Sequence, residues 1–194
     1  EVVTDTPAVA KYRAVLFELY LAEAPKSDVI RTMAARYGVT KTRFLKKTDA
    51  ADMLGNKCVL CGLCVRACTE IMGAGAIGFV NRGPYTIVGT PYARPTKDCY
   101  GCGACVHVCP TRAIEMEDRG DTRIMRSWGA TTVPLARCGG CGQYYAPKGL
   151  AVATLARVSP SLNEATAALC PACRGKEIAW TMIRAGRGGA DHRG

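Results

Sequence analysis

The sequence lacks any run of the roughly 18 to 20 apolar residues that a membrane-spanning helix needs, so insertion into a membrane is not expected. Its first twenty residues interleave charged and apolar side chains, which excludes the apolar core of a secretory signal there. Histidine is scarce, and no nucleophile-and-base pair, paired carboxylates or phosphate-binding loop stands out. These absences predict a cytoplasmic protein without a catalytic site of its own.

Cysteine, in contrast, is abundant. The chain has 12 cysteines, all between Cys58 and Cys173, and residues 1–57 contain none. In a reducing compartment, clustered cysteines bind metals more often than they form disulfides. The distribution predicts four parts: an N-terminal helical segment (1–50), a cysteine-rich domain (51–127), a four-cysteine module (128–183) and a flexible tail (184–194).

The cysteine-free part is expected to form two helices. Thr6 is a typical N-cap followed by proline at the first helical position, and the helix should end before Pro25. A second helix is expected to run from a cap at Ser27 to a stop at Gly38. The first helix carries an apolar stripe that comprises Val9, Tyr12, Val15, Leu16, Leu19 and Tyr20. Such a face needs a partner, so this segment is predicted to dock onto another protein.

Two cysteine runs form an internal repeat. Residues 58–68 and 99–109 share the spacing Cys-x2-Cys-x2-Cys-x3-Cys, and each is followed by a strand-like segment, at 76–80 and 113–117. Three thiolates at this spacing wrap one 4Fe-4S cluster, whereas zinc sites use pairs of cysteines. The repeat therefore predicts two 4Fe-4S clusters.

This spacing resembles that of bacterial two-cluster ferredoxins, in which the fourth cysteine of each run ligates the other cluster. The resemblance implies an α+β fold with a ferredoxin-like, pseudo-twofold core between the helical segment and the four-cysteine module. The expected ligands are Cys58, Cys61, Cys64 and Cys109 for the first cluster, and Cys68, Cys99, Cys102 and Cys105 for the second.

The segments around the repeat point to a narrower family. Residues 73–83 and 88–92 resemble the connector in the large iron-sulfur subunit of respiratory complex I and in the small diaphorase subunit of NAD-reducing hydrogenases. Residues 3–7 and 19–25 resemble the stretch that follows the 2Fe-2S domain in that family. However, residues 26–39 lack the His and Cys ligands of the further cluster found there. The resemblance implies an electron-transfer subunit of a larger oxidoreductase.

Two Cys-x-x-Cys pairs lie near the C-terminus. They resemble the two knuckles of rubredoxins and zinc ribbons, which close a tetrahedron around one metal ion. A site for Zn²⁺ or mononuclear iron is therefore expected at Cys138, Cys141, Cys170 and Cys173. A third 4Fe-4S cluster at the same four residues is the alternative.

The resulting functional hypothesis is a subunit that relays single electrons between an upstream donor and the catalytic subunit of an anaerobic oxidoreductase, in a hetero-oligomer. A chain of this size without a 2Fe-2S domain looks most similar to the small subunits that accompany tungsten or molybdenum enzymes. The tungsten-dependent benzoyl-CoA reductases of the aldehyde:ferredoxin oxidoreductase family are the nearest example. An electron-transfer subunit of a hydrogenase or formate dehydrogenase complex is the alternative.

The positive charge leaves a different class of function to consider. The formal net charge of +10 would suit a zinc-ribbon-bearing module that binds nucleic acid and uses its clusters only structurally. Each cluster or metal with four thiolates carries about −2, so three filled sites would reduce +10 to about +4. The charge then favours protein docking surfaces, and no nucleic-acid partner is expected.

Overall fold

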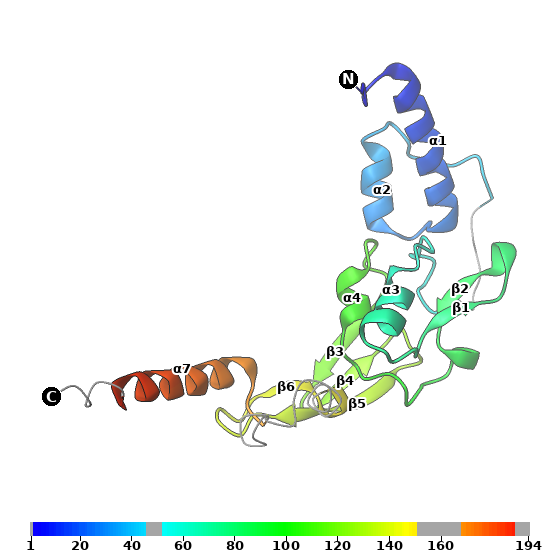
Figure 1. The fold of residues 1–194 in the computed structure, drawn as a ribbon. Coiled ribbons are helices and arrows are strands. Elements are labelled where there is room, and N and C mark those ends of the chain that lie inside the picture. Colours follow the sequence, from blue (N-terminus) through cyan, green and yellow to red (C-terminus); the bar gives the residue numbers. More distant parts are fainter. Residues whose placement is uncertain (1, 46–51, 151–167, 189–194) are drawn as a thin grey trace. The chain divides into compact units, whose positions relative to one another are not determined.

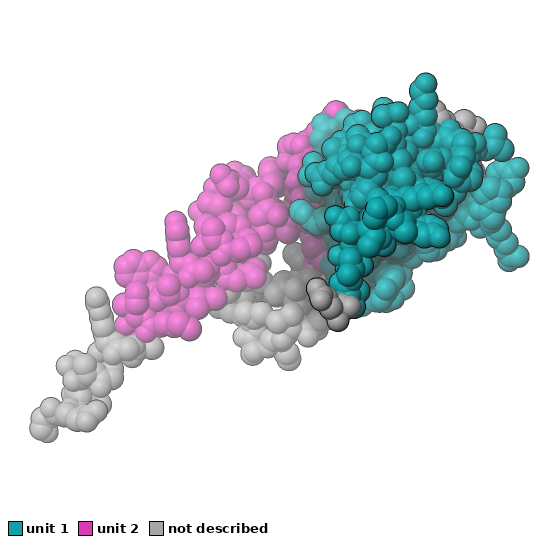
Figure 2. Space-filling model, turned by 90° about the horizontal axis from the view of Figure 1, so that it is seen from above, with its two compact units in different colours: residues 1–99, 103–117, 125–131 teal, residues 100–102, 118–124, 132–194 magenta. Residues whose placement is uncertain are grey.

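The computed structural model describes residues 2–45, 52–150 and 168–188. The chain divides into two compact units, coloured separately in Figure 2. The first unit comprises residues 1–99, 103–117 and 125–131, and the second comprises 100–102, 118–124 and 132–194.

The two expected N-terminal helices are present and lie side by side (Figure 1). Helix α1 (Pro7–Glu23) begins at Thr6, whose Oγ1 accepts a hydrogen bond from the N–H of Val9 at 3.2 Å. Helix α2 (Asp28–Ala35) begins at Ser27, which caps it in the same way. The caps confirm the boundaries that the sequence predicted at the starts of both helices.

Helix α1 has apolar residues on two faces. The face that packs against α2 contributes Leu21, which joins Ala24, Ile30, Ala34 and Val39 in a small buried cluster. The apolar stripe recognised in the sequence lies on the other side, where Tyr12, Leu16, Leu19 and Tyr20 are exposed. The tertiary contacts of α1 therefore use a different set of residues from the stripe.

The cysteine-rich part of the first unit consists of short elements. Helix α3 (Leu63–Arg66) continues into a π-helical turn, η1 (Ala67–Ile71), and a second short helix, α4 (Ala104–Val108), follows later in the chain. Between them lie β1 (Gly78–Val80), the 3₁₀ turn η2 (Gly83–Tyr85), β2 (Ile87–Gly89) and the 3₁₀ turn η3 (Pro91–Ala93). Both cysteine runs thus lead into a short helix.

The strands form two sheets. Strands β1 and β2 pair antiparallel, with Phe79 opposite Val88. A second sheet has the order β3-β4-β5-β6, from strands β3 (Met116–Arg119), β4 (Thr122–Met125), β5 (Thr131–Arg137) and β6 (Tyr144–Pro147). The mixture of helices and antiparallel strands confirms the α+β class. The strands expected at 76–80 and 113–117 are present but begin only at Gly78 and Met116, because the apolar residues at 76–77 and 113–114 are buried in the core instead.

The core of the first unit includes cysteines from both runs. Trp128, with 1% of its surface exposed, packs with the buried residues Leu54, Cys64, Ile77, Val88, Cys105, Ala113, Ile114 and Met125. Cys58, Cys68, Cys99 and Cys109 are half-buried against this cluster. Two cysteines are therefore part of the apolar core, and four more lie at its edge.

The second unit ends in helix α7 (Pro171–Gly188), whose last turn falls in the stretch expected to be a flexible tail. Residues 189–194 lie outside the described residues. Among the helices that the structure describes, none has the length and apolar character required to cross a bilayer.

Candidate metal centres

The two cysteine runs share left-handed backbone at two matching positions. Leu60 and Gly101, the third residues of the runs, have φ of 53° and 65°, and Gly62 and Gly103, the fifth residues, have φ of 74° and 77°. Positive φ at alternate positions turns the chain tightly between the first three cysteines of each run. Glycine accommodates this conformation without strain, whereas Leu60 adopts it at a cost.

The cysteines expected to hold the first cluster lie near one another. Burial is the main cause that raises the pKa of Cys58 to about 11, and the charges of Cys61 and Cys109 add to it. Burial likewise raises the pKa of Cys64 to about 12, with contributions from Cys58, Cys105 and Cys61. Cys58 and Cys64 are therefore each affected by a cysteine of the other run, Cys109 and Cys105 respectively.

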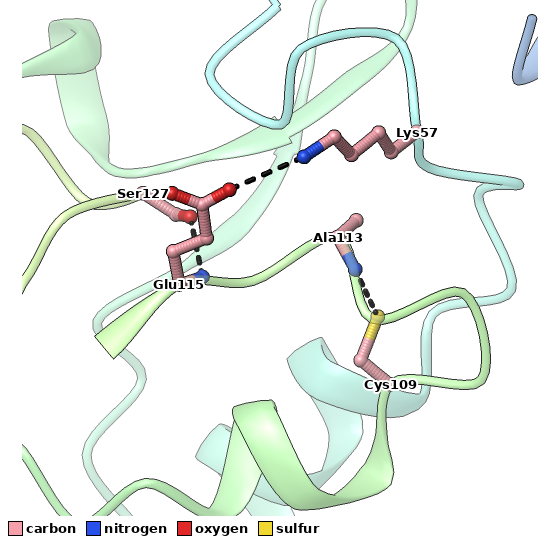
Figure 3. A network of polar contacts seen from close by, with 5 residues as sticks. All are labelled: Lys57, Cys109, Ala113, Glu115 and Ser127. Atoms are coloured by element: carbon pink, nitrogen blue, oxygen red, sulfur yellow. Dashed lines mark hydrogen bonds and ion pairs between the residues drawn. The ribbon is translucent and has the colours of Figure 1, made fainter. Parts of the chain in front are cut away.

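A polar network holds Cys109 in place near the first run (Figure 3). The N–H of Ala113 donates to Cys109 Sγ at 3.3 Å. Two residues later, Glu115 accepts from Lys57 Nζ at 3.2 Å, and its own N–H donates to Ser127 Oγ at 2.9 Å. Because Lys57 directly precedes Cys58, this network ties the segment after Cys109 to the start of the first run.

Hydrogen bonds to sulfur are a further feature of the site. The N–H of Leu60 donates to Cys58 Sγ at 3.3 Å, and the N–H of Ala113 donates to Cys109 Sγ. N–H groups directed at a thiolate stabilise its charge and help to set the reduction potential of a bound cluster. Sequence reasoning singled out neither donor, because the local positive φ of Leu60 and the fold around Ala113 place them.

The cysteines expected to hold the second cluster are Cys68, Cys99, Cys102 and Cys105. Cys105 is buried, and Cys68 and Cys99 lie at the edge of the same core. Cys102 belongs to the second unit, where it lies close enough to Arg123 for its charge to affect the guanidinium. All twelve cysteines lie within the described residues and none forms a disulfide, so the donors that two 4Fe-4S clusters require are available.

The four C-terminal cysteines converge. Cys138 and Cys141 lie in the turn between β5 and β6, Cys170 precedes α7, and Cys173 lies in its first turn. Their Sγ atoms all lie within 4.8 Å of one another, and those of Cys141 and Cys170 are 3.9 Å apart. The fold therefore brings together two pairs that are far apart in the sequence.

Backbone groups prepare this site for a cation. The N–H of Cys170 donates to Cys138 Sγ at 3.2 Å and, with the N–H groups of Cys141 and Gly140, lowers the pKa of Cys138 to about 6. Hydrogen bonding to the sulfurs of Cys170, Cys141 and Cys138 raises the pKa of Cys173 to about 12. Four sulfurs this close cannot all be negatively charged without strong mutual repulsion, and a bound metal ion would offset that repulsion.

The space around the site is limited. A Cβ atom at Gly140 would lie 3.3 Å from Cys173 Sγ, so a side chain larger than hydrogen crowds the sulfur there. The N–H of Gly139 donates to the carbonyl oxygen of Ala168 at 3.1 Å and links the two halves of the site. These contacts keep the two Cys-x-x-Cys turns facing each other.

Comparison of the sequence with known proteins supports iron-sulfur chemistry. Residues 98–146 match the family described as a 4Fe-4S dicluster domain. The match includes the second cysteine run, together with Cys138 and Cys141, and does not extend to the first run. The matched segment thus supports 4Fe-4S chemistry in this chain.

Longer relatives match a larger part of the chain. It is 31% identical over 131 residues to an NADH-quinone oxidoreductase component of Rhizobium meliloti, covering 57% of this chain and 15% of the relative. It is 28% identical over 131 residues to NADP-reducing hydrogenase subunit HndD of Solidesulfovibrio fructosivorans, covering 57% and 22%. It is 42% identical over 82 residues to NADPH-Fe(3+) oxidoreductase subunit alpha of Geobacter sulfurreducens, covering 41% and 9%. The chain thus carries a 4Fe-4S dicluster-type segment and is similar to one small part of much longer oxidoreductase and hydrogenase subunits.

Proposed function

We propose that this chain acts as an iron-sulfur electron-transfer subunit, relaying single electrons to or from the catalytic subunit of a larger oxidoreductase. The observation that carries the proposal is that Cys58 and Cys109, which belong to different cysteine runs, pack against the same core cluster. A cysteine supplied by the opposite run is the arrangement of two-cluster ferredoxins. The match to a 4Fe-4S dicluster domain supports the same chemistry.

Two clusters are assigned to the eight cysteines of the runs. The ligand sets are Cys58, Cys61, Cys64 and Cys109 for the first cluster, and Cys68, Cys99, Cys102 and Cys105 for the second. Both sets follow from the repeated spacing, and the effect of Cys109 on the pKa of Cys58 supports the first. When bound, such clusters accept and release one electron at a time.

Residues around the cysteines position the thiolates and shield them from water. Cys64 and Cys105 are buried in the core beside Trp128, which limits water access at the centre of the site. The N–H groups of Leu60 and Ala113 stabilise charge on two of the sulfurs. Burial and N–H···S bonds are two of the means by which a protein sets cluster potentials.

The third site is assigned to a single tetrahedral metal ion, Zn²⁺ or mononuclear iron. Metal-sulfur bonds of about 2.3 Å in a tetrahedron place neighbouring sulfurs about 3.8 Å apart. The 3.9 Å between Cys141 Sγ and Cys170 Sγ agrees with this value. A 4Fe-4S cluster binds each thiolate at a separate iron, so its cysteine sulfurs lie farther apart. The geometry therefore favours one ion over a third cluster.

The proposed docking surface for a partner subunit is the exposed apolar stripe of α1. Tyr12, Leu16, Leu19 and Tyr20 recur at helical spacing and are all exposed. The named relatives favour a complex that uses NAD(P)H or hydrogen as the electron source or sink. They lend no support to a tungsten partner such as benzoyl-CoA reductase, which rests on resemblance in the sequence alone.

Anaerobic purification with iron, sulfide and zinc analysis tests the proposal. We expect about eight irons and eight sulfides per chain, one further metal ion, and two reducible EPR signals. Cys64→Ser should lower the iron content and leave the third metal in place, whereas Cys170→Ser should remove only that metal. Fewer than about eight irons in the unmodified protein would contradict the two-cluster assignment. Irreducible clusters combined with salt-dependent nucleic-acid binding would instead indicate a structural role.

A further inference from the structure

Arg123, in strand β4, is held between two partners within the second unit. Its Nε and Nη2 donate to the two carboxylate oxygens of Asp118 at 2.7 and 2.8 Å. The remaining nitrogen, Nη1, donates to the carbonyl oxygen of Gly101 at 2.9 Å. The side chain is 13% exposed, so the guanidinium is fixed in place and largely removed from water. A bidentate carboxylate pair and a third hydrogen bond leave it little freedom to rotate.

The Gly101 contact directs positive charge at the second cysteine run. Gly101 immediately precedes Cys102, so the nitrogen that Asp118 does not use faces the loop that carries this cysteine. Hydrogen bonding to Asp118 is the main cause that raises the pKa of Arg123, and the charge of Cys102 adds to it. An arginine stays protonated at any physiological pH, so this charge is permanent.

The first run has a fixed charge of the opposite sign. Asp52 accepts hydrogen bonds from the N–H of Leu54 at 3.0 Å and from the N–H of Asn56 at 2.8 Å. These bonds hold the carboxylate in the turn that leads into Cys58. Besides burial, which is the largest cause, the charge of Asp52 raises the pKa of Cys58. The first run therefore has Asp52 near it, besides Lys57, which is paired with Glu115. The second run has the largely buried Arg123 near it, besides the exposed Asp98.

We propose that Arg123 and Asp52 give the two clusters unequal reduction potentials, so that an electron resides preferentially at the site that includes Cys102. A cluster gains negative charge when it is reduced, so a nearby cation stabilises the reduced state and a nearby anion destabilises it. In the corresponding step, the site at Cys58 loses one electron and the site at Cys102 gains it, and no protein bond changes. This inference rests on the proposed two-cluster function and adds a direction to it.

The test is a potentiometric titration of the loaded protein, followed by EPR. We expect Arg123→Gln to lower one midpoint potential by about 59 mV, which is a tenfold change in the reduction equilibrium of a one-electron couple. Arg123→Lys should leave this potential close to that of the unmodified protein, because lysine keeps the positive charge. Asp118→Asn should raise the same potential, since it removes the counterion and leaves the cation. Asp52→Asn should raise the other potential.

Arg126→Gln is the matched control, because it removes the same charge from an arginine that pairs with Glu117. It should leave both potentials close to those of the unmodified protein. Shifts of the same sign in Arg123→Gln and Asp118→Asn, or potentials that do not respond to Arg123→Gln, would overturn the inference while leaving the two clusters in place. If Arg123→Gln loses iron, Asp118→Asn provides the test. A rise in its midpoint potential supports the inference, and a fall or no change overturns it. Absence of clusters from the unmodified protein would instead overturn the proposed function.

Discussion

Gly62 and Gly103 occupy the same position in the two cysteine runs and adopt the same left-handed conformation, with φ of 74° and 77°. Each lies at the N-cap of a short helix, α3 or α4, that carries the next cysteine of its run. The repeat in the sequence is therefore matched by a repeat in the local backbone. The conformation excludes most side chains, because a residue with a Cβ pays a steric cost there.

Alanine at either glycine should destabilise the protein by about 1–2 kcal/mol, the cost of a left-handed conformation. Gly103→Ala should cost more, because its Cβ would lie 3.3 Å from Met116 Sδ in a partly buried position. At Gly62 the neighbour is the Phe79 ring, which is 53% exposed and can turn away. Thermal unfolding of the loaded protein under anaerobic conditions measures the difference.

Gly78→Ala is the control for this pair, because Gly78 has an ordinary φ and a Cβ there would meet nothing within 4 Å. It should unfold at nearly the temperature of the unmodified protein. An equal loss of stability in all three variants would contradict the conformational explanation.

Two leucines on α1 should respond differently to the same substitution. Leu21 is 7% exposed and packs in the cluster with Ile30, whereas Leu16 is 53% exposed. Leu21→Ala should lower the free energy of unfolding by about 2–5 kcal/mol, because it leaves a cavity. Leu16→Ala should change it by less than about 0.5 kcal/mol, as is usual for surface positions.

The same leucine pair tests the docking role of the stripe. Leu16→Ala should weaken association with a partner subunit in pull-down experiments from native extract, although it leaves the fold intact. Unchanged association of the Leu16 variant, or a large loss of its stability, would show that the stripe is not a docking surface.

Trp128 provides a test of the core around the cysteines. Its indole is buried, and within the described part of the chain Nε1 has no hydrogen-bond partner. Trp128→Ala should cost about 3–5 kcal/mol through loss of packing. Trp128→Phe should cost much less, because it keeps most of the apolar contact and removes an N–H that makes no hydrogen bond. Comparable losses in the two variants, measured by thermal unfolding, would indicate that the N–H does have a partner.

Removal of the metal should make the C-terminal cysteines sensitive to oxidation. Cys141 is exposed and its Sγ lies 3.9 Å from that of Cys170, close enough for a disulfide after a small movement. Treating the zinc-depleted protein with oxidised glutathione should give a Cys141–Cys170 cross-linked peptide, as two thiols are oxidised and the glutathione disulfide is reduced. Mass spectrometry of the digested protein detects it, and the metal-loaded protein should be protected. Equal oxidation of both forms would argue against a metal at this site.

The local features of the fold could be read from the sequence. Thr6 and Ser27 mark the starts of α1 and α2 because a helix cap depends on residues within one turn. The positions of the cysteine runs were equally clear, since their spacing is local. The strands expected at 76–80 and 113–117 were placed too early, because the apolar residues at 76–77 and 113–114 are buried in the core and do not belong to a sheet.

The sequence by itself singled out the cysteines as candidate ligands for iron or another metal, because ligand chemistry and spacing are properties of short segments. Only the tertiary structure decided which face of α1 is buried, which groups donate to Cys58 and Cys109, and how close Cys141 comes to Cys170. It also placed Arg123 beside Gly101, from which it is separated by more than twenty residues in the chain. These relationships depend on long-range packing, and no pattern of neighbouring residues encodes them.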